Sequence, residues 1–157
     1  MKKLYMQALV IILFVGVLPF FSWTSARAEE MTCPPHTPVT IDIKPGGTPN
    51  RITLSSKGLI PVAVFTTEDF DASRFIPEMA HLSDSNTAML HICAGASAVR
   101  WKLDDVNRDG RLDLVFFFST QDTNLTPNST NATFMAHGSY DLTVLHIMGT
   151  DSVLVKP

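Results

Sequence analysis

Short stretches in which apolar and polar residues alternate run along most of this chain after residue 38, and they predict β-strands. Residues 39–43 and 51–55 alternate in this way, and the segment 44–50 between them contains two prolines and two glycines, which impose a turn. Residues 59–65 form a nearly continuous apolar run with Pro61 near its start. This composition is typical of a buried strand whose proline lies at its beginning or at a sheet edge.

The second half of the chain continues the strand pattern, and no stretch shows a long helical period. Residues 68–79 suggest at most one helical turn or a loop, and residues 119–133 are polar. Many short strands separated by turn residues predict an all-β protein, a single-domain antiparallel β-sandwich. The remaining expected strands are 81–93 as a pair with a turn at 84–86, then 99–103, 114–118, 141–148 and 152–155.

The N-terminus differs from the rest of the chain. Lys2 and Lys3 precede an apolar run at 8–21, and the Ala-Arg-Ala triplet at 26–28 places small residues at the two positions that a signal peptidase reads. The run of about 14 residues is shorter than the roughly 20 that a membrane-spanning helix needs. We therefore expect residues 1–28 to be a signal peptide and the protein to be secreted or periplasmic, with a retained membrane anchor as the alternative.

Cleavage after residue 28 would leave a chain of the length typical of a single domain. Residues 29–38 are polar and proline-rich and are expected to form an N-terminal linker or cap, and residues 39–157 are expected to form the β-sandwich domain. Loss of Lys2, Lys3 and Arg27 would change the formal net charge from −3 to −6. This acidity argues against nucleic acid and anionic membranes as partners, and the mature chain shows no membrane span.

The two cysteines, Cys33 and Cys93, both lie beyond the signal peptide. In an oxidising compartment two thiols usually pair, so we expect a disulfide between them, with free or intermolecular thiols as the alternative. Such a bridge would close a loop of about 60 residues and stabilise the fold by about 4 kcal/mol in the chain-entropy model. Neither cysteine lies in a short ligand-spaced motif, which argues against a thiolate metal site.

An acidic loop at 105–113 carries the clearest chemistry in the sequence. It reads Asp-x-Asn-x-Asp-Gly-x-x-Asp, and a hard cation such as calcium takes many oxygen ligands that a tightly turning loop can bring to one point. Gly110 occupies the position of the sharp turn. The expected calcium ligands are side-chain oxygens of Asp105, Asn107, Asp109 and Asp113 and the backbone carbonyl of Arg111.

The sequence of this loop allows two alternatives to the calcium-loop prediction. An EF-hand or dockerin loop needs glutamate at its twelfth position and helices on both sides, whereas Phe116 occupies that position and strands are expected to flank the loop. The pattern is closer to the loops of integrin-type propeller blades, in which the ninth-position aspartate replaces the distal glutamate. A solvated turn is the simplest alternative, because Asn, Asp and Gly are common turn formers.

The segments around the loop carry a wider resemblance. Residues 41–46 read Ile-Asp-Ile-Lys-Pro-Gly, and residues 105–115 read Asp-Val-Asn-Arg-Asp-Gly-Arg-Leu-Asp-Leu-Val. With these segments, the chain resembles small secreted bacterial and archaeal modules that share the same start and the same calcium-type loop and have no established activity. The resemblance implies a β-rich, calcium-associated extracellular domain. Arg108 departs from it, since glycine is common at that position.

The sequence contains no catalytic motif that we can identify. The five histidines show no His-Glu-x-x-His spacing, and there is no Gly-x-Ser-x-Gly elbow or glycine-rich phosphate loop. We therefore expect a non-catalytic module with a structural calcium ion that binds an extracellular protein or a glycan. A carbohydrate-binding domain, with Trp101 and Tyr140 as an exposed platform, is the alternative, followed by a hydrolase or inhibitor with an unrecognised site.

Overall fold

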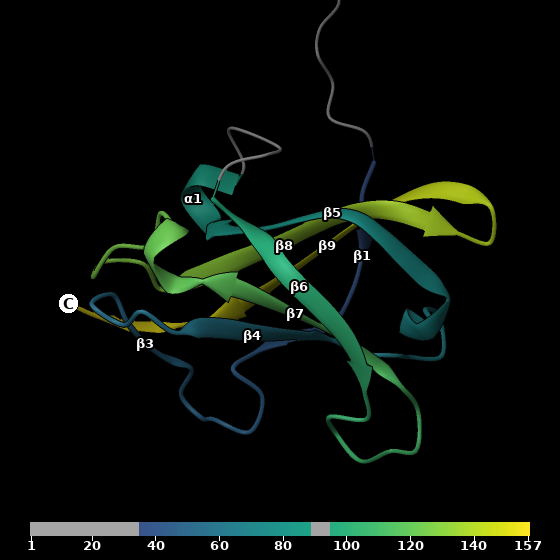
Figure 1. Ribbon diagram of the computed structural model, residues 1–157, viewed down its shortest axis with the longest axis horizontal. Helices are drawn as coiled ribbons and strands as arrows, with labels where there is room; N and C mark the ends of the chain where they lie inside the picture. The colour runs from purple at the N-terminus through teal and green to yellow at the C-terminus, as the bar shows by residue number, and fades with distance from the viewer. Residues whose placement is uncertain (1–34, 89–94) are drawn as a thin grey trace, which may run out of the picture. The chain divides into compact units, whose positions relative to one another are not determined.

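Strands make up most of the chain in this computed structural model, which describes residues 35–88 and 95–157 (Figure 1). Helical structure in this part of the chain is limited to η1 (Ala72–Arg74), α1 (Ser85–Ala88) and η2 (Thr120–Asp122). The strands are β1 (Thr37–Pro38), β2 (Ile41–Ile43), β3 (Arg51–Thr53), β4 (Leu59–Val64), β5 (Phe75–Asp84), β6 (Ala96–Asp104), β7 (Asp113–Ser119), β8 (Asn131–Tyr140), β9 (Thr143–Ser152) and β10 (Leu154–Lys156).

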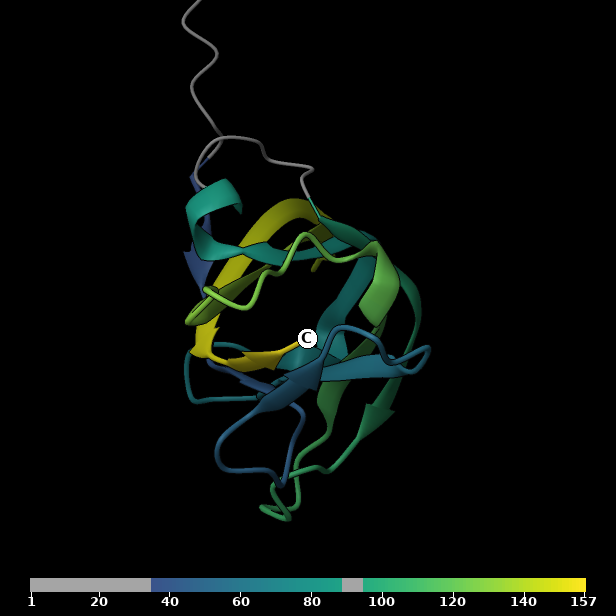
Figure 2. The same ribbon diagram turned by 90° about the vertical axis from the view of Figure 1, so that its left-hand side faces the viewer.

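Eight of these strands form one sheet in the order β1-β9-β8-β5-β6-β7-β4-β2. All neighbours pair antiparallel except β1 and β9, which pair in parallel, and β10 and β3 form a separate parallel pair. The sheet curls strongly into a half-barrel (Figure 2). The predicted β-rich class is confirmed, but a single curled mixed sheet takes the place of the two antiparallel layers expected of a sandwich.

Two irregularities in the ladder accompany this curl. The register between β5 and β8 shifts between Pro77 and Met79, and the register between β6 and β7 shifts between Ala98 and Arg100. An extra residue in one strand bends it and increases the local twist. Long strands that twist and bend in this way can enclose a core within one sheet.

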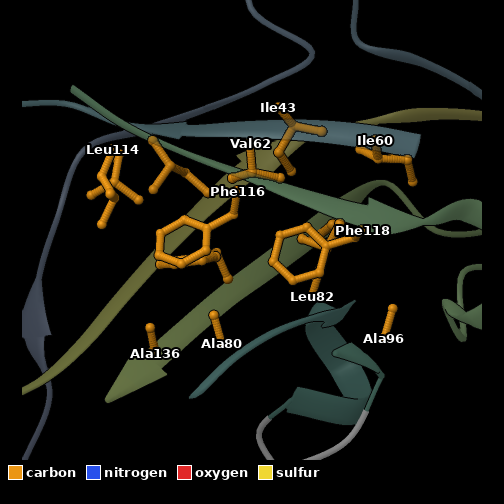
Figure 3. Packing of buried hydrophobic residues seen from close by; sticks show 14 of the residues in the cluster. Ile43, Ile60, Val62, Ala80, Leu82, Ala96, Leu114, Phe116, Phe118 and Ala136 are labelled. Atoms are coloured by element: carbon orange, nitrogen blue, oxygen red, sulfur yellow. The ribbon is translucent and has the colours of Figure 1, made fainter. Parts of the chain in front are cut away.

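The core fills the inner face of the curled sheet (Figure 3). Phe116 and Phe118 of β7 are fully buried and meet Phe134 of β8, with ring centroids 4.9 and 6.2 Å from that of Phe134. These aromatic side chains bury a large apolar area. β7, which begins at the last residue of the acidic loop, supplies two of the three rings. Packing in the core therefore fixes the position of this strand.

Asp151 of β9 connects the two ends of the sheet. Its Oδ2 accepts the backbone N–H of Ile43 in β2 at 2.9 Å and the side-chain N–H of Asn50 at 2.8 Å. At Gly149 a Cβ atom would lie 2.6 Å from Cγ2 of Ile41, so only glycine fits where β9 passes β2. The opposite edges of the curled sheet therefore meet through a carboxylate and a close backbone approach.

Several sequence-based expectations differ from the structure or fall outside it. β8 begins inside the segment 119–133 that was expected to be a polar loop, and α1 follows β5 where a strand turn was expected. β1 lies at the end of the segment 29–38 expected to be a linker or cap. The predicted signal peptide, Cys33 and Cys93 lie outside the described residues. In the described ranges, no helix has the length and apolar character needed to cross a membrane.

Candidate functional site

The acidic loop connects β6 and β7, which pair directly at its base. Leu103 pairs with Leu114, and Asp104 pairs with Asp113. The loop extends away from the body of the sheet, at the bottom of Figure 1. The expected flanking strands are present, and they form a β-hairpin that the loop closes. A hairpin fixes both ends of the loop, so the loop has little freedom to open.

Backbone N–H groups of the loop hold three of the expected ligand side chains. Asp105 accepts the N–H of Asp109 at 3.1 Å and the N–H of Gly110 at 3.0 Å, one on each carboxylate oxygen. The amide oxygen of Asn107 accepts the same N–H of Asp109 at 3.1 Å. Asp105, Asn107 and Asp109 therefore lie together on one turn of chain.

Two residues of the loop have left-handed backbone conformations. Gly110 has φ +86°, which glycine adopts at little cost, and Arg108 has φ +61°, which is unfavourable for a residue with a Cβ atom. A glycine would remove this strain at position 108. The loop keeps its turn despite the arginine, which is consistent with the hydrogen bonds to Asp105 and Asn107 that hold it.

Asp109 is an exposed carboxylate that accepts several hydrogen bonds and also forms an ion pair. The backbone N–H of Arg111 donates to it at 2.9 Å, the Asn107 amide donates at 3.0 Å, and the Arg111 guanidinium forms an ion pair with it at 3.1 Å. The backbone N–H of Arg111 holds the pKa of Asp109 below its ordinary value, with the two side chains acting in the same direction. Asp109 is therefore ionised, and a cation in the loop would take the place of the Arg111 side chain.

Asp113 has a different role from the other three side chains. It is fully buried, and its two oxygens accept the N–H of Thr66 at 2.9 Å and the N–H of Val106 at 3.1 Å. The Thr66 hydroxyl in turn donates to the carbonyl of Leu112 at 2.6 Å. Asp113 therefore joins the loop to the segment after β4, and each of its oxygens keeps a second lone pair.

The donor set of the loop suits a hard cation. Three carboxylates, one amide oxygen and backbone carbonyls within nine residues provide only oxygen ligands, the type that calcium prefers. Within residues 35–88 and 95–157, no three His, Cys, Asp or Glu side chains are already gathered around one point. Calcium binding would therefore draw the Asp109 and Asp113 oxygens toward Asp105, a movement that the flexible 6–8-fold coordination of calcium tolerates.

A polar pocket that the sequence analysis missed lies where the two ends of the sheet meet. It has a volume of about 440 Å³, and Asp42, Asn50 and Asp151 are among the residues that line it. Burial raises the pKa of Asp42, and the charge of Asp151 raises it further. Asp42 and Asp151 are more than 100 residues apart in sequence, so no local spacing could have indicated this pocket.

A larger groove of about 500 Å³ lies between β5 and β6. Pro77 and Met79 line it from β5, and Trp101, which is 46% exposed, lines it from β6. Tyr140 is not part of this groove, because its ring stacks on Phe70 at 5.5 Å. Of the expected pair Trp101 and Tyr140, only Trp101 lines this groove.

No protein-family model matches this chain, and a comparison with curated proteins finds no match.

Proposed function

We propose that this protein is a secreted or periplasmic, non-catalytic β-domain whose acidic loop binds one structural calcium ion. The observation that carries the proposal is the loop itself: Asp105, Asn107 and Asp109 lie on one turn, and the buried Asp113 lies at its end. The resemblance to secreted modules with the same loop pattern supports it.

Calcium would stabilise the domain in two ways. Its charge would offset the repulsion among three carboxylates held on nine residues. Its bond to Asp113 would also connect the hairpin tip to Thr66, because Asp113 already accepts the N–H of that residue. The loop is flanked by paired strands, so we expect the site to hold the fold together and not to act as a helix-moving switch.

Limited proteolysis tests the proposal at the loop itself. Trypsin cleaves after Arg108 and Arg111, both exposed in the loop, and calcium binding would hold these bonds in a turn that a protease cannot extend. We expect cleavage in the loop to be at least tenfold slower in millimolar calcium than in EDTA. Cleavage after Lys57, exposed in a turn outside the loop, is the internal control and should change little. Equal protection at both places would contradict a site in the loop.

The groove between β5 and β6 is the binding surface that we propose for an extracellular partner. These two strands pair only at His81 with Ser97 and at Leu82 with Ala96, and further along β6 pairs with β7 alone. The second edge of β6 is thus left with backbone groups that an extended segment of another protein can pair with. This favours a role in assembly at the cell envelope or outside the cell.

A carbohydrate is the second candidate partner, and Trp101 favours it. An exposed indole in a groove can stack on the apolar face of a sugar ring, and the groove offers enough room for one. The absence of Tyr140 from this groove weakens the case, because one aromatic ring gives a smaller platform than two.

Replacing Trp101 with alanine should weaken binding to the cognate protein or glycan at least tenfold, because the largest exposed apolar group of the groove is lost. A glycan array and a pull-down from envelope extracts, run in parallel, identify which class binds. Val144→Ala removes an exposed apolar group on β9 and serves as the matched control. Equal loss of binding in both variants would show that the groove is not the binding surface.

A further inference from the structure

Three neighbouring strands carry an alternating array of histidine and methionine on the sheet face opposite the core. In the ladder, Met79 pairs with His137 and His137 with His146, while His81 pairs with Met135 and Met135 with Met148. Directly paired residues of antiparallel strands point to the same face, as do residues two apart along a strand. The array therefore consists of two rows that cross β5, β8 and β9 side by side.

One pair of imidazole rings in this array has the spacing of two ligands of a shared metal ion. The ring centroids of His137 and His146 lie 5.7 Å apart, and His36, which precedes β1, lies beside them with its ring 5.9 Å from that of His146. Two imidazoles that bind one metal through nitrogens at about 2.0–2.1 Å have ring centres about 5–6.5 Å apart. Among the described residues, no three such side chains are already placed to hold a metal ion, so binding would require these side chains to turn on their strands.

The buried histidine of the array has a ring nitrogen that is not paired within the described part of the chain. His81 is only 9% exposed, and its Nε2 atom has no hydrogen-bond partner among the described residues. The other nitrogen, Nδ1, lies 3.4 Å from the hydroxyl of Ser97. A buried polar atom that makes no hydrogen bond costs free energy, so its presence in a native structure needs an explanation. Binding of a ligand by this nitrogen is one such explanation. A small cavity of about 20 Å³ is lined by His81 together with His36, Met79, Met135, Ala136, His137 and His146.

An acidic side chain lies beside this face. Glu78 Oε2 lies 3.8 Å from Nε2 of His137, which is too far for a hydrogen bond, so this contact leaves both nitrogens of that ring available to a metal ion.

The combination of ligands selects the metal. Thioether sulfur is a soft ligand that favours Cu(I), imidazole also suits copper, and calcium or magnesium would require oxygen. We propose that this His/Met face binds one Cu(I) ion through the imidazoles of His81, His137 and His146 and the thioether of Met135. The site is separate from the acidic loop and does not depend on calcium binding there.

Anaerobic competition between the purified chain and a chromophoric Cu(I) chelator tests this site. The cysteine thiols are alkylated first, so that Cys33 and Cys93 cannot bind the metal, and no histidine tag is used. We expect one Cu(I) ion per chain, and X-ray absorption should show both nitrogen and sulfur neighbours. His146→Gln and Met135→Leu should each weaken binding at least tenfold, and Met135→Leu should also reduce the sulfur signal.

The Asp122→Asn variant, which changes an exposed carboxylate in η2, is the matched control and should bind Cu(I) as the unmodified chain does. Failure to retain Cu(I) against the chelator, an affinity of both His146→Gln and Met135→Leu that equals that of the unmodified chain, or a metal with no sulfur neighbour would each overturn the proposal. His137 and His146 are only partly buried, so a His137→Gln variant keeps the test decisive if Met135→Leu fails to fold. Because the Cu(I) ligands and the calcium ligands share no residue, either site can fail without the other.

Discussion

Replacing Asp113 with alanine should lower the free energy of unfolding by about 3–5 kcal/mol, even in EDTA. The carboxylate is fully buried and accepts the backbone N–H groups of Thr66 and Val106. Its removal would leave both donors without a partner, and a hydrogen bond to a charged group contributes about 1.5–3 kcal/mol. The hairpin would also lose its connection to the segment after β4.

Denaturant unfolding of Asp113→Ala, Asp113→Asn and Asp141→Ala measures this effect. The asparagine keeps the shape but turns an N–H group toward one of the donors, so it should fall between alanine and the unmodified chain. Asp141 pairs with Arg74 at the surface, where an ion pair contributes about 1 kcal/mol or less. If Asp113→Ala is no more destabilising than Asp141→Ala, Asp113 does not anchor the loop.

Calcium should raise the melting temperature of the chain by about 10 °C when it is supplied at about 100 times its dissociation constant. A ligand at that concentration stabilises the folded state by about 2.7 kcal/mol, and 1 kcal/mol shifts the midpoint of a domain of this size by about 4 °C. Magnesium at the same concentration should have a much smaller effect, because it holds its water and demands a more rigid octahedral site.

Loop variants separate this effect from general salt effects. Asp105→Asn and Asp109→Asn should each reduce the calcium-dependent shift to a few degrees or less, because each removes a charged ligand. Asp122→Asn removes an exposed carboxylate in η2 and should leave the shift unchanged. A calcium shift that survives in both loop variants would place the ion elsewhere on the protein.

The hairpin and its loop were the part of the molecule that the sequence predicted best. The alternating segment 99–103 and the apolar segment 114–118 indicated β6 and β7, and Asp105, Asn107 and Asp109 occupy alternate positions of the loop between them. These features are local, so a sequence can report them. The burial of Asp113 and its contact with Thr66 are not local and required the structure.

β8 was missed because its burial does not alternate. Residues 132–136 are buried at every position, since one face packs in the core and the other carries Met135 beside His81. The polar start of this strand also made it look like part of a loop. The His/Met face was missed for the same reason: its members come from three strands and have no common spacing in the sequence.

The sheet arrangement was the least predictable feature. Short alternating strands fit a sandwich and a curled sheet equally well, and the choice depends on register and on contacts between distant residues. The contacts of Asp151 with Ile43 and Asn50, which connect the ends of the sheet, span about 100 residues of sequence. A pattern that is read locally cannot contain such a contact.

Calorimetric titration of calcium into the purified chain, after treatment with EDTA, tests the central claim most directly. We expect one calcium ion to bind per chain, with much weaker binding of magnesium and at least tenfold weaker calcium binding in Asp105→Asn. Absence of binding heat at several temperatures, together with an unchanged melting temperature in calcium, would contradict a calcium site in the 105–113 loop.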